Sequence, residues 1–592
     1  MSPEKTDFWQ LLNARAVPGL LLFSLMASLI LVLVSTPADA QNLLPNPLQN
    51  PICSRIDNQI QVSLGLRIYC FGRQPNGPGT SASSIQSSSG TIPYSGGASA
   101  SSFSPNVNAA SLAEDISPSG SRAYGQAETS IAASGRYVVE AWNDFTGAIS
   151  LCPSPMNKEE LTGAGFSNDG GNTFTDIGGL PNNDCNNNRL FGDPSVEVFH
   201  APNGTTYFYI SSLYLPLSSN FTDQTFKIAL NVCTVTGSGN LSCSQPVIAA
   251  KSSECDFSCS VLDKPFMTLD PVNNRLYISY TEFGFLTATN GQVELATCDI
   301  TIPAAPVCAN GSSTPTGVPA APYYVVAPSD ANCAQNGAYP AVDRRTGDVY
   351  VAWEFNWVTN FSVAACADTS TPVVNKLARI PRMCLTFPTT TTCPSQSTRS
   401  IPIVSMDLAM IPGYNRFPMN DFPRIAVSEL AGTVSVVWND ARSNPGGDIL
   451  LQTFNLGPSL TPTSLAPIKL NNDNVSGTFH FMPALRNADS RGRISISWYD
   501  RRLNPNSALT DVFAAVAINP RITSTPSSNQ RVTDISSNWL SVSADFIPNF
   551  GDYTDNYASP PPSPTDDDPL FVAWTDGRLN VPQPFESHAP LR

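Results

Sequence analysis

The chain has 592 residues, of which only 13% are charged, and it contains 52 prolines and 37 glycines. This length and turn-rich composition argue against a small helical domain and favour many short strands separated by turns. The formal net charge of −15 and the lack of a long basic run argue against nucleic acid as a partner.

The N-terminus has the pattern of a secretory signal. Two basic residues precede an apolar run at 20–34, and Ala38 and Ala40 form an Ala-x-Ala cleavage site. We therefore predict a signal peptide over residues 1–40 and a secreted, extracytoplasmic protein. An uncleaved signal would instead leave the chain anchored at its N-terminus. Beyond this segment we expect no membrane contact.

Three further regions follow the predicted signal. Residues 41–72 form a short segment in which Cys53 and Cys70 can close one loop. Residues 73–123 are rich in Ser, Gly and Pro and show no hydrophobic periodicity, which predicts a flexible linker. We expect one globular domain over residues 124–592.

A two-strand pattern recurs seven times in this domain. An apolar run is followed by a polar turn and then by a second apolar run that often ends in Trp or Tyr. The copies span residues 128–144, 192–214, 263–283, 339–355, 421–442, 481–502 and 551–578. Between successive copies there is room for two more strands. The pattern predicts an all-β fold, a β-propeller of six or seven four-stranded antiparallel blades.

The packing of such units also predicts how the ring closes. One four-stranded sheet cannot bury both faces alone, whereas radial packing buries both and leaves only short edges. Separate β-sandwiches would need linkers between the units, and the sequence shows none. Because the last copy ends near the C-terminus, we expect the N-terminal part of the domain to complete the last blade.

One turn in the first unit carries a family resemblance. It reads Ser-x-Asp-x-Gly-x-Thr-Phe and resembles the Asp box of bacterial neuraminidase repeats. The strand starts GDPSV and DKPFMTLD and the exits WNDAR, WYDRR and WTDGR resemble those of secreted sialidase-like propellers. The residues of the turn are Ser167, Asp169, Gly171, Thr173 and Phe174. We expect a structural turn between the third and fourth strands, away from the axial face.

The resemblance also implies a site. In sialidases the axial face holds three arginines that grip the substrate carboxylate, a Tyr/Glu nucleophile pair and an Asp acid/base. Their first arginine usually lies in an Arg-Ile-Pro motif. Here that motif occurs only at 379–381, in the middle of the chain, where we expect an outer strand and therefore a coincidental match. The resemblance implies an extracellular glycan or glycoprotein as the partner.

Propeller geometry identifies candidate site residues. In each blade the start of the first strand and the loop between the second and third strands lie on the same face, which we call the axial face. The candidate catalytic residues are Asp193, Asp263, Asp421, Asp552, Glu354 and Tyr553. The candidate ligand-binding residues are Lys264, Arg424, Arg442, Arg502 and Arg578. Such a set suits acid–base work on a sugar. The alternative is that the Asp-x-Arg pairs only hold turns, since scaffolding repeats in every blade.

Fourteen cysteines, all after the predicted signal, indicate disulfides. Three closely spaced pairs would each staple a hairpin of the third and fourth strands. They are Cys233–Cys243, Cys298–Cys308 and Cys384–Cys393. Nearest-neighbour pairing of the remaining cysteines gives Cys53–Cys70, Cys152–Cys185, Cys255–Cys259 and Cys333–Cys366.

The sequence favours no metal or cofactor. The acidic run 566–568 lacks the alternating spacing and the glycine of a Ca²⁺ loop. Zinc at Cys255 and Cys259 would need a second Cys or His pair nearby. We expect a monomer that binds or hydrolyses glycans at the axial face. The rival hypothesis is a non-catalytic binding or adhesion module with purely structural repeats.

Overall fold

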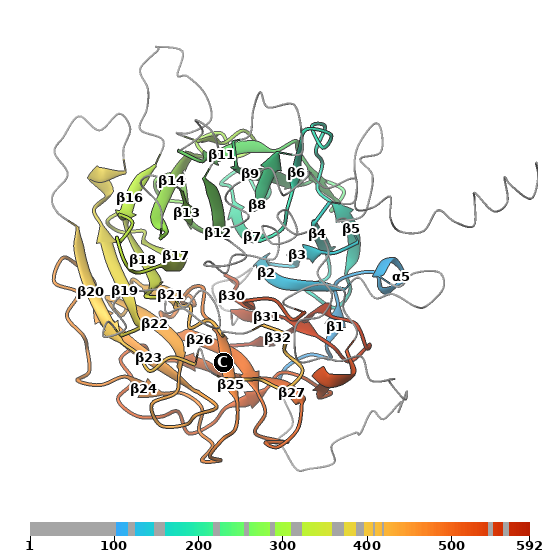
Figure 1. The fold of residues 1–592 in the computed structure, drawn as a ribbon. Helices are drawn as coiled ribbons and strands as arrows, with labels where there is room; N and C mark the ends of the chain where they lie inside the picture. The colour runs from blue at the N-terminus through green and yellow to red at the C-terminus, as the bar shows by residue number, and fades with distance from the viewer. Residues whose placement is uncertain are drawn as a thin grey trace, which may run out of the picture.

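The computed structural model describes residues 102–115, 125–146, 160–216, 225–253, 260–284, 290–308, 323–357, 372–385, 396–406, 409–416, 419–542, 549–560 and 568–591. These residues form seven antiparallel sheets arranged as the blades of a ring (Figure 1). The predicted β-propeller is confirmed, with seven blades. The predicted signal peptide and the Cys53–Cys70 segment lie outside the described residues.

The first four blades follow one another along the chain. Blade one contains β2 (Gln126–Ser134), β3 (Tyr137–Asp144), β4 (Thr162–Ser167) and β5 (Thr175–Gly179). Blade two contains β6 (Asn188–Leu190), β7 (Ser195–His200), β8 (Thr206–Pro216), β9 (Lys227–Val235), β10 (Leu241–Cys243) and β11 (Val247–Lys251). Blade three contains β12 (Val261–Asp270), β13 (Arg275–Phe283), β14 (Gln292–Asp299), β15 (Val307–Cys308) and β16 (Tyr324–Ala327). Blade four contains β17 (Gln335–Asp343), β18 (Asp348–Phe355), β19 (Val374–Ile380) and β20 (Ser397–Pro402).

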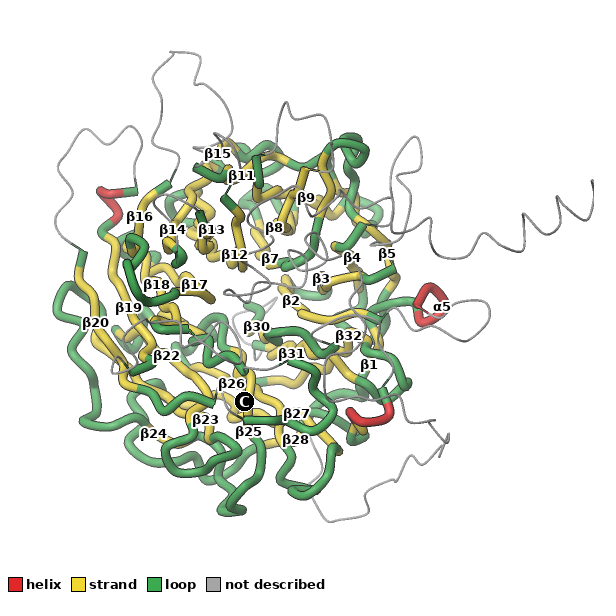
Figure 2. The backbone as a smooth tube through the Cα atoms, in the orientation of Figure 1, coloured by secondary structure: helices red, strands yellow, loops and turns green. Residues whose placement is uncertain are grey.

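The remaining blades complete the ring. Blade five contains β21 (Arg424–Ser428), β22 (Thr433–Asp440), β23 (Asp448–Asn455) and β24 (Ile468–Lys469). Blade six contains β25 (His480–Ala484), β26 (Ile494–Asp500), β27 (Leu509–Ile518), β28 (Gln530–Arg531) and β29 (Ser537–Asn538). Blade seven contains β30 (Asp555–Ala558), β31 (Pro569–Asp576) and β32 (Gln583–Pro590). Figure 2 shows these strands with the loops that join them at the rim and on the two faces.

Blade seven takes its fourth strand from the N-terminal side of the domain. β1 (Val107–Asn108) pairs antiparallel with β32, and in Figure 1 the blue start of the domain lies beside the red end. We predicted that the N-terminal part of the domain, from residue 124 on, would complete this blade. The closing strand instead comes from residues 107–108, within the predicted linker 73–123. Residues 102–115, with the short helix α5 (Leu112–Asp115), therefore lie on the propeller, ahead of the predicted boundary at residue 124. A two-residue strand is too short to leave a periodic pattern in a Ser-rich sequence.

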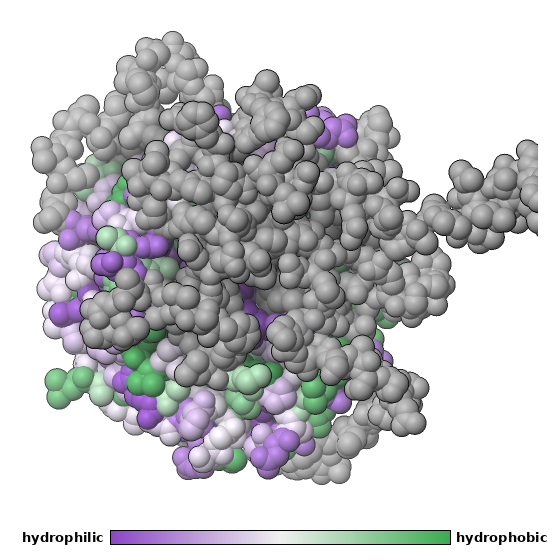
Figure 3. All heavy atoms as spheres, in the orientation of Figure 1, coloured by the Kyte–Doolittle hydropathy of each residue, from purple (hydrophilic) through white to green (hydrophobic). Residues whose placement is uncertain are grey.

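The second strand of each hairpin supplies much of the core between blades. Five of these strands carry a fully buried tryptophan two residues before they end, namely Trp142, Trp353, Trp438, Trp498 and Trp574. In three blades the indole Nε1 donates to the aspartate two residues later, over 2.7–2.9 Å. The aromatic ring is thereby buried while its one polar group stays satisfied. The described surface in Figure 3 has polar and apolar side chains intermixed.

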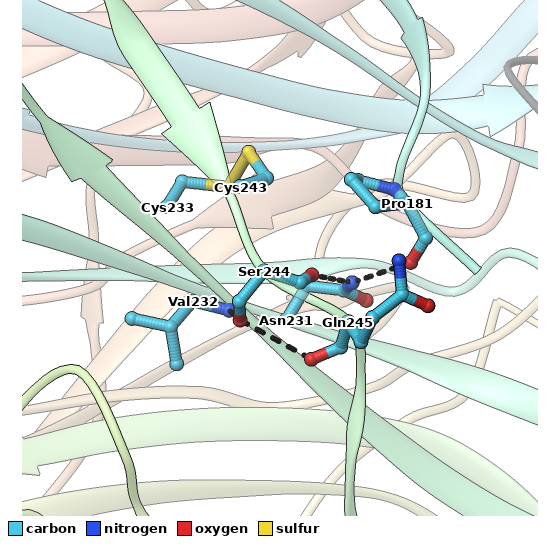
Figure 4. The surroundings of a disulfide bond; sticks show 7 residues. All are labelled: Pro181, Asn231, Val232, Cys233, Cys243, Ser244 and Gln245. Carbon is cyan, nitrogen blue, oxygen red and sulfur yellow. Dashed lines mark hydrogen bonds between the residues drawn. A yellow bond between two sulfur atoms is a disulfide. The ribbon is translucent and has the colours of Figure 1, made fainter. Parts of the chain in front are cut away.

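Two disulfides lie in hairpins of third and fourth strands, as predicted. Cys233 on β9 faces Cys243 on β10 (Figure 4). Cys298 on β14 faces Cys308 on β15 in the next blade. Both pairings are confirmed.

The other cysteine predictions stay untested. Cys185, Cys333 and Cys384 are disulfide-bonded, but their predicted partners lie outside the described residues. The pairs Cys53–Cys70 and Cys255–Cys259 lie wholly outside them. No helix in the described ranges is both long and apolar enough to cross a membrane.

The Ser-x-Asp-x-Gly-x-Thr-Phe segment forms the turn between β4 and β5. Gly171 N donates to Ser167 Oγ over 2.9 Å, and Ser167 Oγ donates to Asp169 Oδ1 over 2.8 Å. Asp169 also accepts from Thr173 N and Thr173 Oγ1, over 2.9 and 2.7 Å. Phe174 packs against the core shared by blades seven, one and two. These contacts agree with the structural role that we expected for the turn.

Candidate functional site

The innermost strands carry a bulge at equivalent positions. Register shifts occur between Ala127 and Ser130, Asp263 and Phe266, Asn336 and Tyr339, and Phe481 and Ala484. The first residue of each bulge has a positive φ, as does the residue two positions before β7 in blade two. These residues are Glu128 (60°), Lys264 (55°), Gly337 (68°), Met482 (49°) and Asp193 (52°).

Only one of these five residues is a glycine, so the other four hold strained backbone. Such a conformation costs a non-glycine residue about 1–3 kcal/mol, and strain of this kind concentrates at functional sites. Three of the four strained residues, Glu128, Asp193 and Lys264, are charged. Their side chains come from three successive blades and meet near the axis of the ring.

The meeting point is the ammonium group of Lys264. Its Nζ lies 2.7 Å from Asp552 Oδ2, 3.5 Å from Glu128 Oε1 and 3.7 Å from Asp193 Oδ2. Arg416 Nη1 binds the other oxygen of Asp552. All five side chains are buried. We call Glu128, Asp193, Lys264, Arg416 and Asp552 the axial cluster.

Asn143, near the end of β3, positions two members of the cluster. Its Nδ2 donates to Glu128 Oε2 over 2.8 Å, and its Oδ1 accepts from Asp193 N over 2.7 Å. Asp552 N donates to Glu128 Oε1 over 2.9 Å. Blades seven, one and two are therefore held together by hydrogen bonds at the cluster itself, which fixes the carboxylates relative to one another.

Two groups of the cluster have unfilled hydrogen-bonding positions within the described ranges, although a protonated Asp193 can donate to Glu128. Neither carboxyl oxygen of Asp193 accepts a hydrogen bond, and Nε and Nη2 of Arg416 donate none. A buried polar group left in this state costs about 1–3 kcal/mol. Asp193 and Arg416 thus offer a ligand one carboxyl group and one edge of a guanidinium group.

The pKa values of the carboxyl groups diverge. Burial raises the pKa of Asp193 well above its usual value, and the neighbouring carboxylates of Glu128 and Asp263 raise it further against the effect of Lys264. Burial also opposes ionisation of Asp552, but Arg416 and Lys264 outweigh it and lower the pKa of Asp552. Asp193 therefore holds a proton more readily than Asp552, whose surroundings favour the ionised form.

Arg416 reaches the cluster from a connection between blades four and five. We call its described residues 409–416 the strap. Tyr414 Oη donates to Gly551 O over 2.7 Å, and Asn549 N donates to Asn415 Oδ1 over 2.7 Å. Arg501 Nη2 donates to Pro412 O over 2.8 Å. The strap is therefore fastened to blades six and seven.

A second polar layer fills the axis. Arg486 donates to Tyr339 Oη and to Asp555 Oδ2, each over 3.0 Å, and its Nη2 lies 3.2 Å from Glu197 Oε1. The guanidinium carbon of Arg424 lies 4.2 Å from the centre of the Tyr339 ring. These residues join blades two, four, five, six and seven, so side chains block the channel at this level.

The structure brings three of the predicted residues, Asp193, Asp552 and Lys264, into the axial cluster. Tyr553 borders it, since its ring centre lies 5.2 Å from Lys264 Nζ. Asp263 accepts from Asn336 Nδ2 over 3.1 Å, and its charge reaches both Asp193 and Lys264.

Asp421 and Glu354 hold blades together instead. Glu354 Oε2 accepts from Asp421 N over 2.9 Å, and Asp421 Oδ1 accepts from Asn439 Nδ2 over 2.6 Å. Arg424 belongs to the second layer, where it donates to Thr554 O. Arg379 of the Arg-Ile-Pro motif lies on β19, the third strand of its blade, and binds Asp348 over 2.6 Å. That motif therefore lies on an outer strand, as expected.

The remaining predicted arginines are held by the aspartate two residues earlier. The Nη2–Oδ2 distances are 2.7 Å for Arg442–Asp440, 2.6 Å for Arg502–Asp500 and 2.8 Å for Arg578–Asp576. These contacts favour the interpretation in which the Trp-x-Asp-x-Arg segments are structural. Within the described ranges, no group of three or more His, Cys, Asp or Glu side chains could hold a metal ion.

Two members of the cluster were missed from the sequence. Glu128 occupies, in the first copy, the position of Asp193 and Lys264 in the next two copies. An alignment of the copies on that position would have found it, although the first copy lacks the proline that follows in the others. Arg416 lies outside the repeats, and no signal in the sequence pointed to it.

No protein-family model and no curated protein sequence matches the chain. Among solved structures, an α-L-arabinofuranosidase of Fusarium graminearum is 10% identical and has a TM-score of 0.39, with 83% of this chain and 98% of that chain covered. The Hadza microbial sialidase Hz136 is 12% identical at a TM-score of 0.36, with 74% of each chain covered. A Trypanosoma rangeli sialidase is 11% identical at a TM-score of 0.33, with 82% of this chain and 58% of that chain covered.

Sialidase propellers are thus among the folds that this chain resembles, as expected from its repeats. At these identities the likeness concerns the fold alone and assigns no activity to the residues of the axial cluster.

Proposed function

We propose that the protein is an extracytoplasmic, glycan-acting propeller and that the axial cluster is its reactive site. The observation that carries the proposal is the carboxyl group of Asp193, which is buried on strained backbone and accepts no hydrogen bond. Strain and an unsatisfied acid together are what a preorganised catalytic group shows. The similar folds include glycosidases acting on arabinofuranosides and sialosides by their names.

The cluster supplies the two protonation states that glycosidic cleavage needs. Asp193, with its raised pKa, would donate a proton to the glycosidic oxygen. Asp552, with its lowered pKa, would stabilise positive charge on the sugar ring or activate water. Both carboxyl groups lie within 3.7 Å of the same Lys264 nitrogen, so one sugar unit could contact both. Disulfide-stapled hairpins suit an extracytoplasmic location.

The test is a panel of fluorogenic glycosides, sialosides included, incubated with the full chain and with Asp193→Asn. We expect turnover of at least one glycoside and a loss of about 10³-fold in kcat for the variant, because the proton donor is removed. Asp169→Asn is the matched control. Its turn lies at the opposite end of blade one, as the β3–β4 register shows, and turnover should be retained.

The rival function is a non-catalytic glycan-binding module. Complete burial of the axial cluster, and the contacts between blades made by Arg486 in the second polar layer, favour this alternative. Retention on a glycan array without turnover of any glycoside would support it and would contradict the hydrolytic role of Asp193.

A further inference from the structure

The Nε–Nη2 edge of the Arg416 guanidinium group makes no hydrogen bond, whereas the same edge of Arg442 is fully hydrogen-bonded. In Arg442 the Nε and Nη2 groups bind Asp440 over 2.8 and 2.7 Å, so this edge of the guanidinium group is fully used. In Arg416 the same two groups have no hydrogen-bond partner, although the residue is buried. Arg416 therefore presents two parallel donors at the axial cluster that only a ligand or water can satisfy.

The charge around this edge decides which ligand oxygens suit it. Near the axis, buried carboxyl groups outnumber buried cations. The carboxyl groups are those of Glu128, Asp193, Glu197, Asp263, Glu354, Asp421, Asp552 and Asp555, and the cations are Lys264, Arg416, Arg424 and Arg486. Burial raises the pKa values of Asp193, Glu128 and Glu197, but without these three the remaining carboxylates still outnumber the cations, five to four. An additional carboxylate would therefore add negative charge to a region of low dielectric that already holds an excess of it.

A pair of sugar hydroxyl groups meets both requirements. Each hydroxyl oxygen can accept from Arg416 without adding charge, and each hydroxyl hydrogen can donate to a neighbouring carboxylate. A carboxylate on the ligand could only accept. Within the same cluster, the Nε–Nη2 edge of Arg416 supplies free donors and the carboxyl oxygens of Asp193 accept no hydrogen bond, which matches this mixture of donors and acceptors.

We propose that the axial cluster takes an uncharged sugar unit, whose neighbouring hydroxyl groups are bound by the Nε–Nη2 edge of Arg416, in preference to an anionic sugar. This inference rests on the proposed function. It makes Arg416 a specificity-determining residue of the site.

The experiment compares neutral glycans with anionic counterparts, and the glucose and glucuronic acid pair isolates the carboxylate. Galactose-terminated glycans are arrayed with and without a terminal sialic acid, and glucose-terminated glycans beside their glucuronic acid counterparts. The full-length protein should bind at least one neutral glycan at least tenfold more tightly than its charged counterpart. Tighter binding of the charged partners would overturn the inference and leave a glycan-binding function standing.

Arg416→Lys tests the edge itself, because lysine keeps the charge but lacks two parallel donors. We expect at least tenfold weaker binding of the preferred neutral glycan, whereas Arg442→Lys, whose edge is closed by Asp440, should bind as the unmodified protein does. Unchanged binding by a folded Arg416→Lys variant would overturn the role of Arg416. If this variant fails to fold, the array comparison with the unmodified protein still decides. If no glycan of either kind is bound or cleaved, the proposed function and this inference both fail.

Discussion

Gly171 lies against the carboxyl group of Glu586. A Cβ atom on Gly171 would stand 3.0 Å from Glu586 Oε2 and 3.0 Å from His588 Nδ1. Gly171 belongs to the β4–β5 turn of blade one, and Glu586 lies on β32 of blade seven. The Ser-x-Asp-x-Gly turn thus contacts the last blade across the junction where the ring closes.

Gly171→Ala should destabilise the protein by about 2–4 kcal/mol, because the φ of +90° and the contact with Glu586 act together. Gly204→Ala is the matched control, since Gly204 has a φ of +83° but open space around its Cβ position. The difference between the two variants in urea unfolding measures the contact alone. Equal destabilisation of the two variants would show that the contact between Gly171 and Glu586 adds nothing to stability.

Glu586 should make stability depend on pH. Burial raises its pKa from 4.5 to about 7, with His588 opposing the shift and Asp169 adding to it. The native state therefore holds a proton that the unfolded chain releases, so stability is fully present below pH 4.5 and is lost as pH rises to about 7.

The loss should be on the order of 3 kcal/mol. Glu586→Gln should flatten this part of the profile, as measured by denaturant midpoints between pH 4 and pH 8. Glu140 on β3 belongs to the same junction. Burial raises the pKa of Glu140, and the negative charge of Glu586 raises it further. A Glu586→Gln profile parallel to that of the unmodified protein would refute the assignment.

The Asp-x-Arg turns should affect stability and leave glycan binding unchanged. Asp440 accepts from Trp438 Nε1 and from Val404 N, over 2.9 and 3.1 Å, and is buried. Asp440→Ala should therefore cost about 2–4 kcal/mol. Arg442→Ala should cost under about 1 kcal/mol, because its side chain is 33% exposed. A specific loss of glycan binding in Arg442→Ala would restore the ligand-binding role predicted from the sequence.

The strap should have to move before a glycan reaches the buried axial cluster. Asn415 and Asn549 exchange hydrogen bonds between backbone N–H groups and side-chain oxygens. A disulfide between Asn415→Cys and Asn549→Cys should lower glycan binding at least tenfold, and mild reduction should restore it. The single variants and the unmodified protein under the same reductant serve as controls. Normal binding by the cross-linked form would show that the strap does not gate the site.

The fold could be predicted from the sequence because each blade repeats the same pattern of apolar strands and polar turns. Each copy is a hairpin of two apolar strands joined by a polar turn, and four of the seven copies end in Trp-x-Asp, as at Trp438 and Trp498. The hairpin disulfides were accessible for the same reason, since ten residues separate Cys233 from Cys243, a spacing that fits a tight turn between paired strands.

The site was only partly accessible because its members do not repeat. Asp193, Lys264 and Asp552 were found from their place at first-strand starts. Glu128 was missed because the copies were not aligned on the position of Asp193 and Lys264, and the first copy lacks the proline that follows these two residues. Arg416 was missed because a long connection, and not a blade, brings it to the axis.

The short strand β1 has a consequence for the order of folding. Within the other six sheets the paired strands are near neighbours along the chain, but Val107 pairs with Glu586. Closing a loop of this length costs on the order of 3 kcal/mol more conformational entropy than closing a ten-residue hairpin. The final contact therefore forms late, after the last blade exists, and until then β32 presents an unpaired edge. A nascent propeller of this design is most exposed to mispairing at the moment when it is nearly complete.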